Sequence, residues 1–145
     1  MPTVRDILKT KGTTVTTIHH EATVLEAATL MNERRIGAVI VMNGDLIVGV
    51  FSERDLMTRV IVPRREPAGT KVRDVMTSEV RVCSVDSPLE ECRAAMTHHK
   101  IRHLPAVDGD GRLVGLISIG DIVAREIAQQ EETIRFLHEY MQGPN

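Results

Sequence analysis

The hydrophobic and polar positions of this chain predict one order of secondary-structure elements that occurs twice. A β-branched stretch is typical of a short strand, and a run with apolar residues at helical spacing predicts a helix. Two further apolar stretches joined by Asn43-Gly44-Asp45 predict a hairpin, and a second helix is expected from Ser52 onward. The expected strands of this first set are residues 15–18, 38–42 and 46–51, and its first helix opens at residue 23. The second half of the chain repeats the order of strand, helix, strand, strand and helix.

Short sequence blocks that return in the same order identify an internal duplication. Val4-Arg5-Asp6-Ile7-Leu8 returns as Val72-Arg73-Asp74-Val75-Met76, and the pattern Gly49-x-x-Ser52-x-x-Asp55 returns as Gly115-x-x-Ser118-x-x-Asp121. We therefore expect an α/β fold in which two β-α-β-β-α repeats pack with pseudo-two-fold symmetry, followed by a C-terminal helix. The expected divisions are a first repeat at residues 1–62, a linker at 63–71, a second repeat at 72–124 and a helical extension at 125–145.

The first long helix of each repeat starts with a different sequence signal. In copy one, Thr23 stands three residues before Glu26, which has the form of a capping box. In copy two, Ser87 is followed by Pro88 and stands three residues before Glu90, so Ser87 is the expected N-cap and Pro88 the first helical residue. This pattern predicts that the two helices begin one residue out of register.

A long helical pattern follows Asp121 and runs to about Met141. Its apolar residues are spaced at helical intervals, while residues 129–133 are polar throughout. The stripe consists of Val123, Ile127, Ile134, Leu137 and Met141. Two interpretations stay open, a helix that packs back on its own domain and a seam for a second subunit. The unpaired apolar surface leads us to expect a homodimer.

Composition and charge exclude several classes of partner. The chain has 145 residues, a formal net charge of -2 and 2% aromatic residues. That balance offers neither the positive charge nor the stacking rings that nucleic-acid binders use. The longest apolar run, near residues 36–42, is far shorter than the roughly 20 residues of a membrane-spanning helix. The N-terminus lacks the apolar stretch of a secretory signal, so we expect a cytoplasmic protein with Cys83 and Cys92 reduced.

The repeated pattern Gly-x-x-Ser-x-x-Asp has two interpretations. In the structural one, the Ser caps a helix and the Asp three residues later completes a capping box. In the functional one, the Gly lets a ligand approach the backbone, the helix N-terminus and the Ser hydroxyl face a phosphate, and the Asp accepts both hydroxyls of a ribose. The same residue types therefore suit a helix cap and a nucleoside phosphate.

Taken together, the two copies resemble a pair of cystathionine-β-synthase-type (CBS) domains over residues 4–123, most of the chain. The second copy carries the resemblance most closely, through Met96, Ile101-Arg102-His103-Leu104-Pro105 and Gly115-Leu116-Ile117-Ser118. The resemblance implies a regulatory module that binds an adenine nucleotide between the repeats and thereby modulates an effector protein. AMP is the first candidate ligand, with ATP, ADP or NAD(H) as the others.

The resemblance also implies binding residues. Asp55 and Asp121 correspond to the acids that hold ribose, with Ser52 and Ser118 beside the phosphates. The residues expected to frame the base and phosphates are Thr17, Ile18, Gly37, Ala38, Val39, Arg54, Ser84, Val85, Arg102, His103, Leu104 and Pro105. Copy two also has Lys100 at this entrance, whereas copy one has Ile40 where copy two has Pro105, so we expect two non-identical sites. With so few aromatic residues, adenine is expected between aliphatic side chains.

Other chemistry finds little support in the sequence. His98, His99 and His103 align with Glu33, Arg34 and Ala38 of copy one, so no metal-ligating set is shared, and we expect no metal site. A nucleophile elbow, a phosphate-binding loop and a paired acid and base are all missing, so we expect no enzyme. The alternative function is a ligand-independent interaction or scaffolding module, in which the Ser and Asp residues only cap helices.

Overall fold

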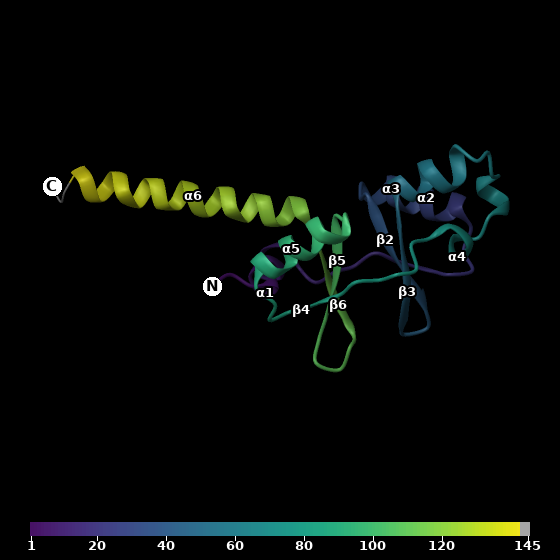
Figure 1. Cartoon of the computed structure of the whole chain (residues 1–145), viewed down its shortest axis with the longest axis horizontal. Coiled ribbons are helices and arrows are strands. Elements are labelled where there is room, and N and C mark those ends of the chain that lie inside the picture. The colour runs from purple at the N-terminus through teal and green to yellow at the C-terminus, as the bar shows by residue number, and fades with distance from the viewer. Residues whose placement is uncertain (143–145) are drawn as a thin grey trace.

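A computed structural model describes residues 1–142 (Figure 1), and its two halves each hold one three-stranded sheet. In the first sheet β1 runs parallel to β2 and β2 is antiparallel to β3; in the second, β4 runs parallel to β5 and β5 is antiparallel to β6. The strands are β1 (Thr17–His19), β2 (Ala38–Asn43), β3 (Leu46–Ser52), β4 (Cys83–Ser84), β5 (His103–Val107) and β6 (Leu113–Ser118). The helices are α1 (Val4–Lys11), α2 (Val24–Arg34), α3 (Glu53–Asp55), α4 (Val72–Val75), α5 (Leu89–His99) and α6 (Ile119–Gln142). The α/β fold with two repeats and a C-terminal helix is confirmed.

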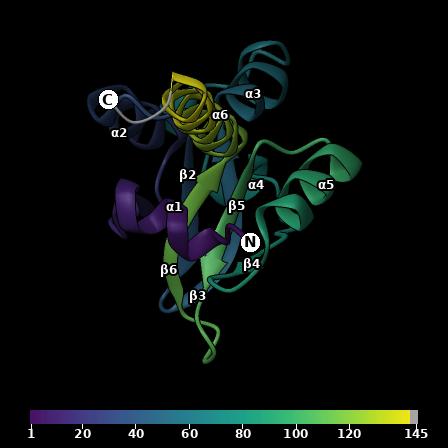
Figure 2. The ribbon, with the colours of Figure 1, turned by 90° about the vertical axis from the view of Figure 1, so that its left-hand side faces the viewer.

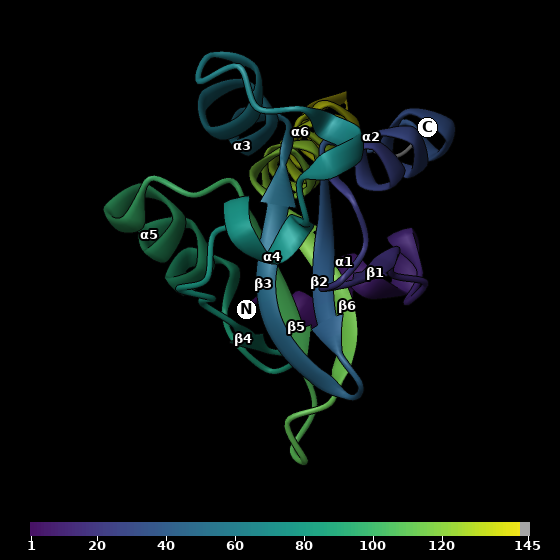
Figure 3. The same cartoon turned by 90° about the vertical axis from the view of Figure 1, so that its right-hand side faces the viewer.

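The short helix that opens each repeat packs on the sheet of the other repeat. Val4, Ile7 and Leu8 of α1 are buried in the core of the second sheet, and Val72 and Val75 of α4 are buried in the core of the first. The first residues of the two exchanged helices form equivalent backbone hydrogen bonds. The Val4 amide donates to Ser87 O at 3.0 Å, and the Val72 amide donates to Ala22 O at 2.8 Å. Figure 2 shows α1 in front of β6, and Figure 3 shows α4 across β3. The two repeats are thus tied together by an exchange of helices.

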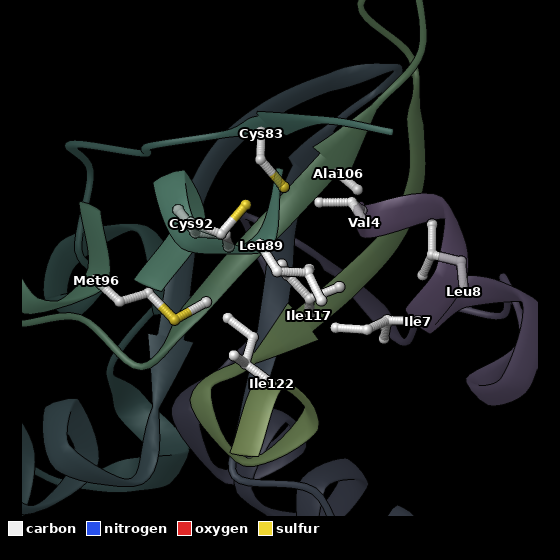
Figure 4. Close-up of a cluster of buried hydrophobic side chains, with 11 residues drawn as sticks. Val4, Ile7, Leu8, Cys83, Leu89, Cys92, Met96, Ala106, Ile117 and Ile122 are labelled. Carbon is white, nitrogen blue, oxygen red and sulfur yellow. The ribbon is translucent and has the colours of Figure 1, made fainter. Parts of the chain in front are cut away.

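The second core is aliphatic and contains both cysteines (Figure 4). Cys83 on β4 and Cys92 on α5 are free and buried, with their sulfur atoms turned toward each other. A hydrogen bond with Cys92, together with burial, raises the pKa of the Cys83 thiol. Cys92 occupies the same helical position as Ala27 in the first core, which is buried too. Both sulfurs therefore serve as apolar packing groups here.

The two long repeat helices begin in the same register, which corrects the expectation from their caps. α2 starts at Val24, and the Thr23 hydroxyl accepts a hydrogen bond from the Glu26 amide at 3.1 Å. α5 starts at Leu89, and its N-cap residue is Pro88, with φ -63° and ψ 143°. Ser87 does not cap α5, because its hydroxyl accepts from the Ser84 amide instead, at 3.0 Å. Extended backbone at Pro88 pairs with Thr3 as Thr23 pairs with Lys71, so the exchanged segments set the helix start.

The helix expected from Ser52 is short. Only Glu53–Asp55 are α-helical, and Leu56–Ile61 continue as a π-helical stretch that includes the buried Val60. The first strand of each repeat is also shorter than its β-branched run suggests. Residues 15 and 16 lie outside β1 and residues 82 and 85 lie outside β4. Both strands pair on one side only, at the edge of their sheets.

α6 extends well beyond the body of the molecule (Figure 1). Ile122 is its one buried residue, and every side chain from Ile127 to Gln142 is exposed. Residues up to Glu132 line a cavity beside α1, so the alternative in which the whole helix packs back on its own domain is wrong for the part of α6 beyond Glu132. Residues 143–145 of the expected extension lie outside the described residues. Within residues 1–142, α6 and the other helices are all too short or too polar to cross a membrane.

Candidate functional site

A cavity of about 570 Å³ lies between the two repeats and brings together the motifs of both copies. The ends of β3 and β6, the starts of α3 and α6, the turn after α5 and the segment 77–81 all contribute to its wall. The expected binding residues that line it are Gly37, Ser52, Arg54, Asp55, Arg102, His103 and Ser118. The cavity therefore combines the Ser-x-x-Asp motif of copy one with the basic entrance of copy two.

Asp55 is held in the cavity wall by three neighbouring residues. Its Oδ2 accepts from the Ser52 amide at 3.0 Å and from the Ser52 hydroxyl at 3.1 Å, while the Asp55 amide donates back to the Ser52 hydroxyl at 3.2 Å. Its Oδ1 accepts from the Thr77 hydroxyl at 3.1 Å and lies 3.8 Å from Arg59 Nε. The capping interpretation of this motif is thus correct. The carboxylate is also oriented and nearly buried, with 6% exposure.

The cavity is lined by more cationic than anionic side chains. Arg54, Arg81, Lys100 and Arg102 face Glu53, Asp55 and Glu79. Lys100 ends α5 in the left-handed conformation, with φ 55°, which turns the chain from the helix toward β5. Four flexible cations around one concave space provide a favourable environment for an anion.

His103 begins β5 and is largely enclosed. Burial lowers the pKa of its imidazole, and the positive charges of Lys11 and Arg102 lower it further against the opposing effect of Asp121 and Glu53. Burial and these two cations therefore favour the neutral form of the ring in the free protein. A neutral imidazole in a cavity lined by cations can take up a proton once an anion is bound beside it.

Sequence reasoning did not single out the segment that follows α4. Thr77, Glu79, Val80 and Arg81 line the cavity, and Thr77 exchanges two backbone hydrogen bonds with Val50 at 2.9 Å each. The exchange of α4 onto the first sheet carries this segment past the end of β3. The only signal in the sequence was the position of the segment directly after the repeated Val-Arg-Asp block.

Asp121 lies away from this cavity and lines a second one of about 600 Å³, between α1 and α6. Its Oδ2 accepts from Lys11 Nζ at 2.8 Å and from the Ser118 amide at 2.8 Å. Burial opposes ionisation, but these two donors outweigh it and lower the pKa of Asp121. The acids of the two motifs therefore line different cavities, and the Asp121 carboxylate already forms an ion pair with Lys11.

The other expected binding residues lie outside both cavities. Ala38 and Val39 on β2 and Leu104 and Pro105 on β5 are buried in the sheets. Thr17 and Ser84 are exposed on the edge strands, and the half-buried Ile18 and Val85 pack against the cores. None of these eight residues lines either space.

The motif glycines make room for the exchanged helices and the segments after them. A Cβ on Gly115 would lie 2.6 Å from Leu8 Cδ2 of α1, and one on Gly49 would overlap the Met76 side chain that follows α4. Either contact is shorter than a side-chain carbon tolerates. The glycine of each motif is thus explained by the packing of the opposite repeat.

Comparisons with known proteins give one consistent family. The model of the CBS domain matches twice, at residues 3–62 and 72–127. The mitochondrial CBS domain-containing protein CBSX3 of Arabidopsis thaliana is 32% identical over 97% of this chain and 72% of its own length. CBS domain-containing protein YhcV of Bacillus subtilis is 31% identical over 90% of this chain and 89% of its own. A structure described as a putative signal-transduction protein with CBS domains, from Burkholderia ambifaria, is 43% identical, with a TM-score of 0.85 over 89% of this chain and 96% of that one. Because the family model matches both repeats, the chain belongs to the CBS-domain family.

Proposed function

We propose that the cavity between the repeats binds an adenine nucleotide and that binding changes the contact of this protein with an effector protein. The observation that carries the proposal is the convergence of Arg54, Arg81, Lys100 and Arg102 on the space beside the oriented Asp55 carboxylate. Cations suit the phosphates, and a fixed carboxylate suits the two hydroxyls of a ribose. The first turn of α6 also lines the cavity, so the positive end of its helix dipole favours an anion there.

The apolar part of the cavity suits the base. Val50, Val80, Ile101 and Ile119 come from four separate segments and line the same space. Aliphatic side chains on two sides of a flat ring supply dispersion contacts without an aromatic partner. AMP, ADP, ATP and NAD(H) are the candidate ligands.

In this proposal the cavity at Asp121 is a second site with weaker affinity for the nucleotide. Ribose binding by Asp121 requires displacement of Lys11, which donates to the Asp121 carboxylate and to Leu116 O, each at 2.8 Å. Asp55 is bound by a hydroxyl and by the cap hydrogen bonds, with Arg59 no closer than 3.8 Å. We therefore place the principal site at Asp55, between the repeats.

Thermal unfolding tests the principal site. A ligand that binds only the native state raises the melting temperature by mass action, so ATP or AMP at millimolar concentration should raise it. Arg102→Ala should remove most of this shift, because Arg102 is exposed and lines the cavity. Arg112→Ala is the matched control, since Arg112 is an equally exposed arginine in the β5–β6 turn and lies outside both cavities. If no adenine nucleotide or NADH moves the wild-type curve, the ligand-independent scaffolding function replaces this one.

The same proposal includes a homodimer acting in the cytoplasm. The apolar residues left exposed on α6 favour self-association. A signalling role then follows from linkage, because a ligand that binds one arrangement of repeats or subunits more tightly shifts the population toward it. The effector protein would read that shift.

A further inference from the structure

One face of α6 carries an unbroken 3-4 spacing of positions that belong to neither core and line neither cavity. The positions are 123, 127, 130, 134, 137 and 141, and all but Gln130 are apolar. The exposed fractions of the apolar side chains are 39% for Val123, 50% for Ile127, 66% for Ile134, 51% for Leu137 and 84% for Met141. We call these six residues the α6 seam. A spacing of alternating three and four residues is that of a coiled-coil seam.

The contacts of α6 with its own domain use other faces of the helix. Ile122 enters the second core, and Glu126 forms an ion pair with Arg93 on α5. Ala124, Arg125 and Ala128 line the cavity beside α1. At 100° per residue these positions fall on either side of the α6 seam. The α6 seam therefore lies outside the cores and cavities even where α6 is close to the domain. Figure 1 shows the distal half of α6 projecting from the body, and Figure 2 shows the same helix nearly end-on.

The partner that fits this face best is a second copy of the same helix. A seam with coiled-coil spacing is filled by knobs from another helix, and an identical helix supplies the same knobs. A bilayer surface is a poorer match, because amphipathic helices that lie on membranes carry Lys and Arg on their polar face. α6 has acids at 121, 126, 131, 132 and 139, and Lys or Arg only at 125 and 135.

We propose that two copies of this chain associate through the α6 seam. This inference rests on the homodimer within the proposed function and specifies its interface. The α6 seam spans 19 residues, roughly 27 Å of helix, which places the interface at the small end of specific interfaces. We accordingly expect a dissociation constant in the micromolar range. Gln130 places one polar residue among apolar layers, a pattern that sets register in coiled coils at some loss of stability.

Sedimentation equilibrium without nucleotide tests the interface independently of ligand binding. Wild type at about 100 µM should have the mass of a dimer and should dissociate on dilution. Leu137→Glu should be monomeric at the same concentration, with at least about tenfold weaker association, because it buries a charge in the seam. Ile134→Glu should behave in the same way. Both sites are exposed in the single chain, so the far-ultraviolet circular dichroism and melting curve of the diluted monomer should stay unchanged.

Phe136→Glu is the matched control. Phe136 is an apolar residue of the same helix with 65% exposure, but it lies on the face opposite the α6 seam. This variant should remain a dimer. A wild-type monomer at about 100 µM would overturn the proposal, and so would a Leu137→Glu variant that still dimerises through another face. Binding of a monomeric wild type to vesicles of anionic phospholipid would overturn it in favour of a membrane surface. A nucleotide-dependent melting shift that persists in the Leu137→Glu variant would show that nucleotide binding does not require the α6 interface.

Discussion

The packing of α1 against the second sheet makes a specific prediction about two residues far apart in the chain. Leu8 is 6% exposed in the second core, and its Cδ2 lies 2.6 Å from the place where a Cβ on Gly115 would be. A methyl group at residue 115 and the leucyl side chain at residue 8 therefore compete for one space. The consequence is a strong coupling between Leu8→Ala and Gly115→Ala.

The magnitudes follow from burial and overpacking. Leu8→Ala removes a buried leucine and should lower the free energy of unfolding by about 2–5 kcal/mol. Gly115→Ala alone should lower it by about 1–3 kcal/mol through overpacking. That loss is offset in part by the roughly 0.4–1 kcal/mol that the restricted unfolded chain contributes. With Leu8 already replaced, the added methyl has room, so Gly115→Ala should become stabilising by about 0.4–1 kcal/mol.

Urea unfolding followed by circular dichroism measures this double-mutant cycle, with all variants at one protein concentration because the chain is expected to dimerise. We expect a coupling free energy of at least about 1 kcal/mol. Gly109→Ala combined with Leu8→Ala is the control, because nothing lies within 4 Å of a Cβ at Gly109. Additivity of Leu8→Ala and Gly115→Ala within about 0.5 kcal/mol would refute the helix exchange.

Two pH dependences follow from the charges of the site. The pKa of His103 is lowered by burial and by nearby Lys11 and Arg102, so a bound phosphate should raise it. Nucleotide affinity in calorimetric titrations should therefore increase as the pH falls from about 7 to about 5.5. His103→Gln should remove the part of this increase that comes from protonation of His103. An unchanged pH profile in that variant would count against proton uptake by His103 on nucleotide binding. The pKa of Asp121 is lowered, with Lys11 and the Ser118 amide outweighing burial, so its ionised form contributes stability at neutral pH that is lost as the pH falls through the folded-state pKa. Asp121→Asn should lower the free energy of unfolding at pH 7 by less than about 1 kcal/mol, since the pair is open to solvent, and by less still at about pH 2, where more of the carboxylate is protonated. An equal loss at both pH values in urea titrations would contradict this assignment.

Much of the architecture could be predicted because it is local in the sequence. The hairpin at Asn43-Gly44-Asp45 needs a residue with positive φ, and Gly44 has φ +61°. The duplication predicted two equivalent units, and the Ser52 and Asp55 spacing predicted a cap that the structure contains. These features depend on neighbouring residues, so the sequence pattern is enough to find them.

The parts that escaped prediction depend on contacts between distant segments. The apolar face of α1 indicates that Val4, Ile7 and Leu8 are buried, but it carries no information on which sheet they meet. For the same reason, the sequence does not show that Asp55 of copy one and Arg102 of copy two line a single cavity. Pro88 replaced Ser87 as the N-cap because the backbone bridge to Thr3 holds residue 88 extended, a constraint imposed by α1 and its neighbours.

The most direct test of the central claim is a nuclear magnetic resonance titration of the labelled protein with ATP. Binding in the cavity between the repeats should shift the backbone amide signals of residues that line it, with the largest changes at Arg81, Arg102 and Gly120. The signals of Thr10 and Ala128, beside the second cavity, should change only at higher nucleotide concentration. Shifts confined to Thr10, Ala128 and their neighbours, or no shifts at millimolar ATP, would contradict the account.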